Sequence, residues 1–267
     1  MSFSGSTFIF DGRASDEFEL TLYQIGSVAH SEGRFAANVE FVEKVVGTKW
    51  KPHFYGIRYD EKLEFDIVFG VNQHRLDEEK YLDRYELEAV ASWLVGHQSY
   101  KWLEIEQGDM DLVRYHCMVT ELEVVEFEQI PWALKAKVVC DGPYAYTYPQ
   151  VFEYEINGSA DIPFLNISSH NGFFMPVMEF DPYNVGNFSI TNEMDNGRTL
   201  RFSEMTATTG TIYVNNDTMV VQCEKGLNLY DYCNCQFLRL VKGYNFLHVT
   251  GDGRLRLICE FPINIGG

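Results

Sequence analysis

The sequence lacks any long apolar run. No stretch approaches the roughly 18 apolar residues that a membrane helix needs, and Met1–Phe10 has neither a basic segment nor the long apolar core of a signal peptide. These absences predict a soluble chain that is made in the cytoplasm.

Basic residues are scarce. The 267 residues include 21 Lys and Arg against 39 Asp and Glu, which gives a formal net charge of −18. A surface this negative repels phosphate backbones, so specific nucleic-acid binding is excluded as a leading function. A well-solvated surface is the simplest interpretation of the charge.

Motifs that carry chemistry are missing as well. The sequence has no G-x-S-x-G elbow, P-loop or G-x-G-x-x-G motif, and none of its seven histidines has a metal-ligand spacing. Cys233 and Cys235 lack the second pair that a zinc site requires. Carboxylates two residues apart occur as chance would give them in an acidic chain; the pairs are Glu104 with Glu106, Asp109 with Asp111, and Glu121 with Glu123. We therefore expect no catalytic, metal or cofactor site.

Three cysteines and four glycosylation sequons have structural interpretations. Cys117, Cys140 and Cys259 stand among apolar strand residues, which is typical of buried small hydrophobes. Without a signal peptide, the N-x-[ST] sequons are interpreted as strand and loop polarity; they lie at Asn157, Asn166, Asn187 and Asn216.

Aromatic residues are abundant, at 15% of the chain. They favour strands and large contact surfaces. Alternating apolar and polar residues predict strands at 18–22, 39–46, 63–69, 100–106, 112–128 and 132–140. One helix is expected between an N-cap at Asp77 and a terminating Gly96, because Leu87, Val90 and Leu94 have helical spacing.

The segment Asp141–Pro149 marks a break in the chain, with two prolines, a glycine and three tyrosines. We expect two domains, 1–148 and 149–267. The second half has no helical pattern and a turn signal about every dozen residues, which indicates short strands in a β-sandwich. Asp195-Asn-Gly and Asp252-Gly are the two predicted hairpin turns.

The order of these elements resembles the distal tail protein family of long-tailed (siphovirus-type) phages. The similarity begins at Phe8-Ile-Phe-Asp-Gly and includes the helix ending at Trp93-Leu94. It is strongest at Val139-Cys-Asp-Gly-Pro-Tyr-Ala, and it ends with Gly243-Tyr-Asn-Phe-Leu-His-Val and Gly251-Asp-Gly, which look like the family's closing hairpin. No single motif is decisive; their order and spacing carry the resemblance.

The resemblance implies a mainly β protein with no enzymatic activity. Residues 1–148 would be a β belt domain with one α-helix, and residues 149–267 a galectin-like β-sandwich. The belt domains would form a homo-hexameric ring at the distal end of the tail tube. The expected partners are the tube protein and a baseplate hub or tail-associated protein, and no membrane insertion is expected. Six copies at −18 give a formal −108, which would let DNA slide through the ring without binding.

Three aromatic residues in the first half are candidates for the ring interface: Phe35, Phe41 and Trp50. Each is equally compatible with burial in the domain core.

Three other functions remain open. The second domain could bind carbohydrate through exposed aromatics, with candidates at Tyr213, Tyr230, Tyr232 and Tyr244. Such a protein would serve in host attachment. A glycosidase would need one of the carboxylate pairs. Another tail component, such as a tube protein, would usually be shorter and lack the second domain.

Overall fold

The computed structural model describes residues 7–25, 39–47, 50–59, 62–71, 81–106, 113–127, 129–184, 186–205 and 210–264. By internal contacts the chain divides into two compact units, Met1–Tyr146 with Asn264–Gly267, and Thr147–Ile263. The division falls within the segment that the sequence marks as a break. Strand β10 (Ala145–Thr147) contains it.

The main sheet of the first unit is antiparallel and has the order β2-β1-β7-β8-β9-β6-β3. Its strands are β1 (Phe8–Phe10), β2 (Arg13–Ala14), β3 (Leu20–Ile25), β6 (Glu64–Val71), β7 (Lys101–Ile105), β8 (Val113–Phe127) and β9 (Ile130–Cys140). A 3-10 turn, η1 (Ser15–Phe18), connects β2 to β3. Alternation along β7 and β9 buries one face, as the period-two pattern predicts.

The helix α1 (Arg84–Leu94) begins later than the sequence analysis predicts. Its N-cap is Asp83, whose carboxylate accepts a hydrogen bond from the Glu86 amide at 2.7 Å, while the Glu86 side chain accepts one from the Asp83 amide at 2.9 Å. This capping box satisfies two amide donors at the start of the helix, which no residue at position 77 could do. The predicted N-cap at Asp77 is therefore wrong; Asp77 itself lies outside the described residues.

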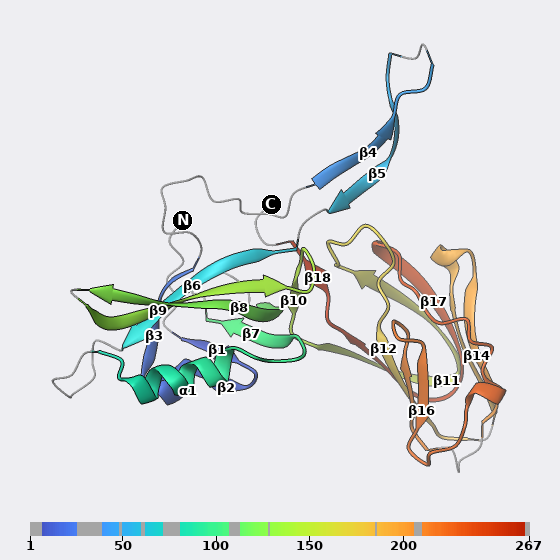
Figure 1. The fold of residues 1–267 in the computed structure, drawn as a ribbon. Helices are drawn as coiled ribbons and strands as arrows, with labels where there is room; N and C mark the ends of the chain where they lie inside the picture. The colour runs from blue at the N-terminus through green and yellow to red at the C-terminus, as the bar shows by residue number, and fades with distance from the viewer. Residues whose placement is uncertain are drawn as a thin grey trace. The chain divides into compact units, whose positions relative to one another are not determined.

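Helix α1 lies beside the first strands of the sheet (Figure 1). Trp93 makes the contacts between them. Its ring stacks on Phe8 at 5.4 Å and on Phe18 at 4.5 Å, and its indole nitrogen donates to the Phe10 carbonyl at 3.0 Å. The buried indole thus has both apolar neighbours and a hydrogen-bond partner. Val90 and Leu94 are buried beside it, as the helical spacing predicts.

The second unit is one curled antiparallel sheet of order β14-β13-β17-β12-β15-β16, with β11 paired along the whole length of β17. Its strands are β11 (Gln150–Asn166), β12 (Val177–Pro182), β13 (Gly186–Asn192), β14 (Arg198–Met205), β15 (Ile212–Asn215), β16 (Val220–Cys223) and β17 (Gly243–Cys259). The short strand β18 (Pro262–Ile263) pairs with β10 and is not part of this sheet. Two 3-10 turns, η2 (Glu193–Asp195) and η3 (Tyr230–Tyr232), complete it. The curled sheet fits the predicted β-sandwich.

Of the two predicted hairpin turns, one is confirmed and one is wrong. Asp195-Asn-Gly connects β13 to β14, whereas Asp252-Gly lies inside the 17-residue strand β17. Gly251 opposes Gly158 on β11, and both have positive φ. Glycine readily adopts a positive φ, and here both strands have a glycine at the same register position. The two strands can therefore bend at this point without losing their pairing.

The bend lets β17 change neighbours. Its first half pairs with β13 and its second half with β12. At Gly253, a side-chain β-carbon would clash with the Asp181 carbonyl and would lie 2.7 Å from the Phe180 ring. Glycine is therefore required at the position of β17 that pairs with Pro182 at the end of β12. Of the strands in this half, β12 to β16 are short, with 4 to 8 residues, as predicted, whereas β11 and β17 have 17 residues each.

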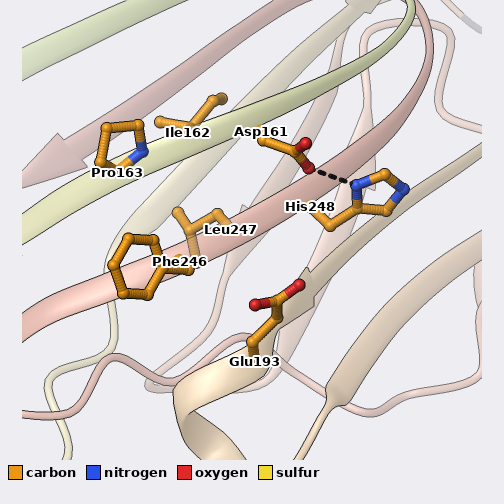
Figure 2. A pocket seen from close by; sticks show the side chains of 7 residues that line it. All are labelled: Asp161, Ile162, Pro163, Glu193, Phe246, Leu247 and His248. Carbon is orange, nitrogen blue, oxygen red and sulfur yellow. Dashed lines mark hydrogen bonds and ion pairs between the residues drawn. The ribbon is translucent and has the colours of Figure 1, made fainter.

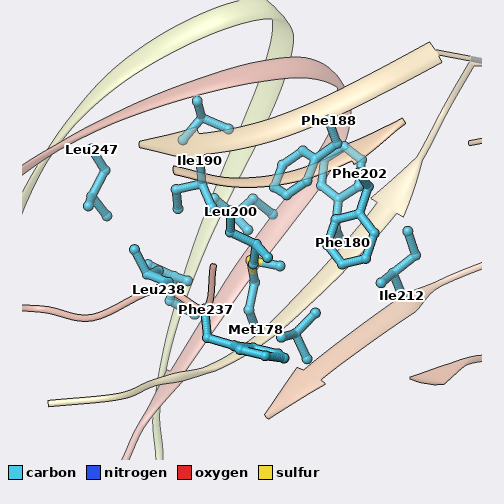
Figure 3. Close-up of a cluster of buried hydrophobic side chains, with 14 of the residues drawn as sticks. Met178, Phe180, Phe188, Ile190, Leu200, Phe202, Ile212, Phe237, Leu238 and Leu247 are labelled. Atoms are coloured by element: carbon cyan, nitrogen blue, oxygen red, sulfur yellow. The ribbon is translucent and has the colours of Figure 1, made fainter. Parts of the chain in front are cut away.

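Aromatic and aliphatic side chains from both halves of the curled sheet form the core of the second unit (Figure 3). Phe180 and Phe188 stack at 3.9 Å, and Phe202 lies 6.4 Å from Phe188. All three are essentially inaccessible to solvent. Burial of such side chains contributes about 1.5–3 kcal/mol each, so this cluster is a main source of the unit's stability.

Buried asparagines hold the segment that precedes β17. Asn216 donates to the Pro176 carbonyl at 2.6 Å and accepts from the Leu238 amide at 2.8 Å. Asn192 donates to the Arg239 carbonyl at 2.7 Å, and Asn245 accepts from the Val241 amide at 2.9 Å. The asparagine side-chain amides thus supply the hydrogen bonds that a neighbouring strand would otherwise give to the backbone of this irregular segment. Asn166 and Asn216, which belong to two of the glycosylation sequons in the sequence, are among these buried asparagines.

The three cysteines expected to be buried are buried. Burial raises the pKa of the Cys117 and Cys259 thiols to about 12 and raises the pKa of Cys140 as well. They are therefore neutral packing residues at ordinary pH. Among the described residues, no helix has the length and apolar character to span a bilayer.

Candidate assembly interface

Strands β4 (Val39–Lys44) and β5 (His53–Tyr59) form a hairpin that is a sheet of its own (Figure 1). The register runs from Val39 opposite Tyr59 to Lys44 opposite His53, with an irregularity after Val42. Gly47, at φ +60, lies in the connection. In the part of the chain that is described, neither strand pairs with another sheet.

The hairpin exposes apolar side chains on both of its faces. Trp50 is 93% exposed and Phe41 is 65% exposed, and the rings of Phe41 and Phe54 are 6.2 Å apart. Because neighbouring strand residues point to opposite faces, the exposed neighbours Phe41 and Val42 show that neither face is covered. The other exposed apolar residues here are Val45, Val46 and Tyr55.

An isolated two-stranded hairpin is marginally stable in water. Seven exposed large apolar residues between Phe41 and Tyr55 add unfavourable hydration to that instability. This combination makes the hairpin a candidate contact surface for a partner. Phe41 and Trp50, two of the three interface candidates, belong to this surface; Phe35 lies outside the described residues.

The sequence analysis did not select the other members of the surface. Phe54 and Tyr55 were missed because an apolar residue in a strand pattern is ordinarily assigned to a core. The available signal was Val45-Val46-Gly47, where apolar residues continue without alternation to the turn. A strand with apolar residues at both odd and even positions has no polar face to turn toward water.

One of the three carboxylate pairs that were considered for catalysis, Glu121 with Glu123, lies beside lysines of β9. Lys137 on β9 lies 3.5 Å from Glu64 on β6 and 3.9 Å from Glu121 on β8. Lys135 lies 3.2 Å from Asp66 and 3.9 Å from Glu123. Hydrogen bonding to Asp66 raises the pKa of Lys135. The acidic residues thus alternate with lysines across three strands.

The remaining candidates are the pair Asp109 and Asp111 and the cysteines Cys233 and Cys235. Asp109 and Asp111 lie outside the described residues, and within those residues no group of histidine, cysteine and carboxylate side chains could hold a metal ion. Cys233 is half-buried and Cys235 exposed, and burial raises the pKa of Cys233 to about 11.

The four tyrosines that were considered for sugar binding lie on three elements of the second unit. The hydroxyl of Tyr230 donates to the Met219 carbonyl at 3.2 Å and accepts from the Val221 amide at 3.1 Å, so it fastens η3 to β16. Tyr213 lies on β15 and Tyr232 on η3. Tyr244 on β17 is the most exposed of the four.

Comparison with known families covers nearly the whole chain. Residues 3–142 match the family model described as the phage tail protein N-terminal domain. Residues 144–259 match the model described as the phage tail C-terminal domain. No curated protein sequence matches the chain.

Among solved structures, the SPP1 Dit protein matches with a TM-score of 0.67 at 12% identity, covering 97% of this chain and 100% of that one. It is described as a paradigm of the hub adsorption apparatus in phages that infect Gram-positive bacteria. A chain of the phage P2 baseplate, activated with Ca, matches at 0.48 and 11% identity, covering 93% and 91%. A chain of the phage p2 baseplate with Sr matches at 0.48 and 11%, covering 99% of both.

The SPP1 match extends over both units and confirms the predicted mainly β, distal tail protein fold. The family models identify both halves independently of that match. The chain therefore belongs to this family of phage tail proteins and is a structural protein of the phage tail and virion.

Proposed function

We propose that the chain forms a homo-hexameric ring at the distal end of the tail tube. The ring connects the tube protein to the baseplate hub or tail tip and leaves a central channel for DNA. The first unit acts as the ring-forming belt domain. The observation that supports this role most strongly is the uncovered β4–β5 hairpin in a tail-protein fold.

A closed ring is built from heterologous contacts, in which one surface of each copy binds a different surface of the next. A hairpin with apolar residues on both faces suits such a contact, because the neighbouring copy can cover the side chains that the hairpin exposes in a single chain. Phe41 and Trp50 are proposed as residues that enter this contact, with Phe54 and Tyr55 beside them.

The acidic charge supports a channel that does not bind DNA. Six copies at −18 carry a formal −108. Where carboxylates line a channel, they repel the phosphate backbone and disfavour binding to the wall. The role is mechanical and not enzymatic, and the chain is made in the cytoplasm of the bacterial host before it joins the virion.

Light scattering coupled to size exclusion, followed by negative-stain imaging, tests the proposal. Six chains of 30.8 kDa give about 185 kDa, and class averages should show a six-fold ring with a central opening. A monomer that persists at the highest concentration reached, both alone and after co-expression with the tube protein, would contradict it.

A further inference from the structure

The outer face of the second unit contains a shallow groove of about 310 Å³ (Figure 2). It lies over the pair β11–β17 and reaches the start of η2. Ile162 and Leu247, which line it, turn into the unit and are buried. The groove is small but falls in the range of about 300–1,000 Å³ that is typical of ligand sites.

One end of the groove is apolar. Phe246 is 50% exposed and stands opposite Pro163 in the strand register. Two residues back along β17, Tyr244 is opposite Leu165, and both are exposed. Side chains two residues apart point the same way, about 7 Å from one another. The rings of Phe246 and Tyr244 thus form a flat apolar strip.

The other end of the groove is polar. Nδ1 of His248 is 2.6 Å from a carboxylate oxygen of Asp161, which fixes the orientation of the imidazole. Nε2 is then the ring nitrogen that can meet a ligand hydroxyl. Figure 2 shows the Glu193 carboxylate on the same side as His248, below the strand pair. On the neighbouring strand, Thr191 stands opposite His248, and its hydroxyl bonds to Thr199 at 2.8 Å.

We propose that this groove binds an uncharged glycan. A sugar ring has an apolar face of C–H groups, which packs on an aromatic ring, and an edge of hydroxyls, which hydrogen-bonds to carboxylates and imidazole. The strip from Tyr244 to Phe246 offers the first surface and the group Asp161, Glu193 and His248 the second. Two carboxylates in an acidic protein repel sialic acid, uronic acid and phosphate groups, so the preferred glycan is neutral.

A polypeptide strand fits the same place poorly. Within the described residues β11 pairs only with β17 along this stretch, but Pro163 has no amide hydrogen to donate to an added strand. Charged side chains on the same strand, at Glu153, Glu155 and Asp161, are exposed, and such charges ordinarily protect an edge from strand addition. The apolar strip faces outward from the sheet and remains available to a sugar ring.

Saturation-transfer NMR on the full chain tests this inference. The probes are maltotetraose, cellotetraose, chitotetraose and lacto-N-tetraose, with sialyllactose as the anionic comparison. We expect transfer to the ring protons of at least one neutral probe and none to the sialic acid. Phe246→Ala and Asp161→Asn should each weaken binding by at least about tenfold.

The matched control is Tyr232→Ala, which removes an exposed aromatic ring outside the groove and should bind as the wild type does. Thermal unfolding of each variant checks that Phe246→Ala has kept its fold. If it has not, Asp161→Asn still tests the groove, because it is a nearly isosteric exchange at an exposed position. Absence of transfer from all neutral probes, equal binding of sialyllactose, or unchanged binding in both groove variants would overturn the proposal. None of these results depends on whether the chain forms a ring.

Discussion

Two antiparallel strand pairs in this protein carry similar aromatic contacts in opposite environments. In β13–β14, the rings of Phe188 and Phe202 are 6.4 Å apart and both are 0% exposed. In β4–β5, the rings of Phe41 and Phe54 are 6.2 Å apart, and both are at least 60% exposed. The distances between the rings are therefore alike, and the difference lies in what covers the two rings.

The comparison separates two uses of an apolar residue. The first pair is covered by strands of its own unit, so its burial stabilises the fold. The second pair has no cover in the described chain, so its burial can only stabilise an assembly. The predictions below test this separation, from the largest expected change in stability to the smallest.

Phe188→Ala should lower the free energy of unfolding by about 3–5 kcal/mol, because it removes a fully buried ring and leaves a cavity. The matched change Phe41→Ala should alter the monomer by less than about 0.5 kcal/mol, because its ring is already in water. Urea unfolding of dilute protein measures both values. Equal losses in the two variants would show that the hairpin is part of a monomer core.

Asn216→Ala should cost about 3 kcal/mol, because it leaves the Leu238 amide and the Pro176 carbonyl buried without their partner. Asn157→Ala, at an exposed position on β11, is the control and should be close to neutral. Urea unfolding again gives the comparison. A small loss at Asn216 would mean that water replaces the amide, and that the segment before β17 is less buried than described.

Gly253→Ala should cost about 1–3 kcal/mol, since the new methyl group overlaps the Phe180 ring and the Asp181 carbonyl. Gly186→Ala adds the same methyl group where nothing lies within 4 Å. The two variants differ in crowding, so their midpoints of thermal unfolding should separate. Equal midpoints would contradict the close approach of Gly253 to the Phe180 ring and the Asp181 carbonyl.

Asp83→Ala should cost about 1 kcal/mol through loss of the helix cap. Glu88→Ala, on an exposed turn of the same helix, removes a carboxylate without touching the cap and should leave stability nearly unchanged. Thermal unfolding followed by far-ultraviolet circular dichroism measures both. A larger effect at Glu88 than at Asp83 would place the start of α1 elsewhere.

Much of this fold was predictable because it is specified by local patterns. Alternation identified β7, β8 and β9, and Asp195-Asn-Gly identified the turn between β13 and β14. The helix start was missed because an acidic run at 77–79 looks like a cap, while the actual capping box, Asp83 with Glu86, is a reciprocal pair. The sequence pattern predicted only Asp77 as the start, and the backbone geometry shows that the cap is Asp83.

The errors in the second half have a different cause. Asp252-Gly has the composition of a turn, yet it lies within a strand, because Gly251 is paired with Gly158, 93 positions earlier in the chain. Such a register is non-local and cannot be deduced from either segment alone. The candidate interface has the same limitation: Phe41 and Trp50 were selected, but exposure of their neighbours depends on what the rest of the chain leaves uncovered.

The central claim is that the apolar hairpin is held by a neighbouring copy, and the mass of the assembly tests it most directly. Light scattering should give about 185 kDa for the wild type, from six chains of 30.8 kDa. The double variant Phe41→Ser and Trp50→Ser should give the monomer mass with unchanged monomer stability. Tyr85→Ser removes a highly exposed aromatic ring on α1 and should still assemble. If the hairpin variant assembles as fully as the wild type, the hairpin is not the ring contact and the account is wrong.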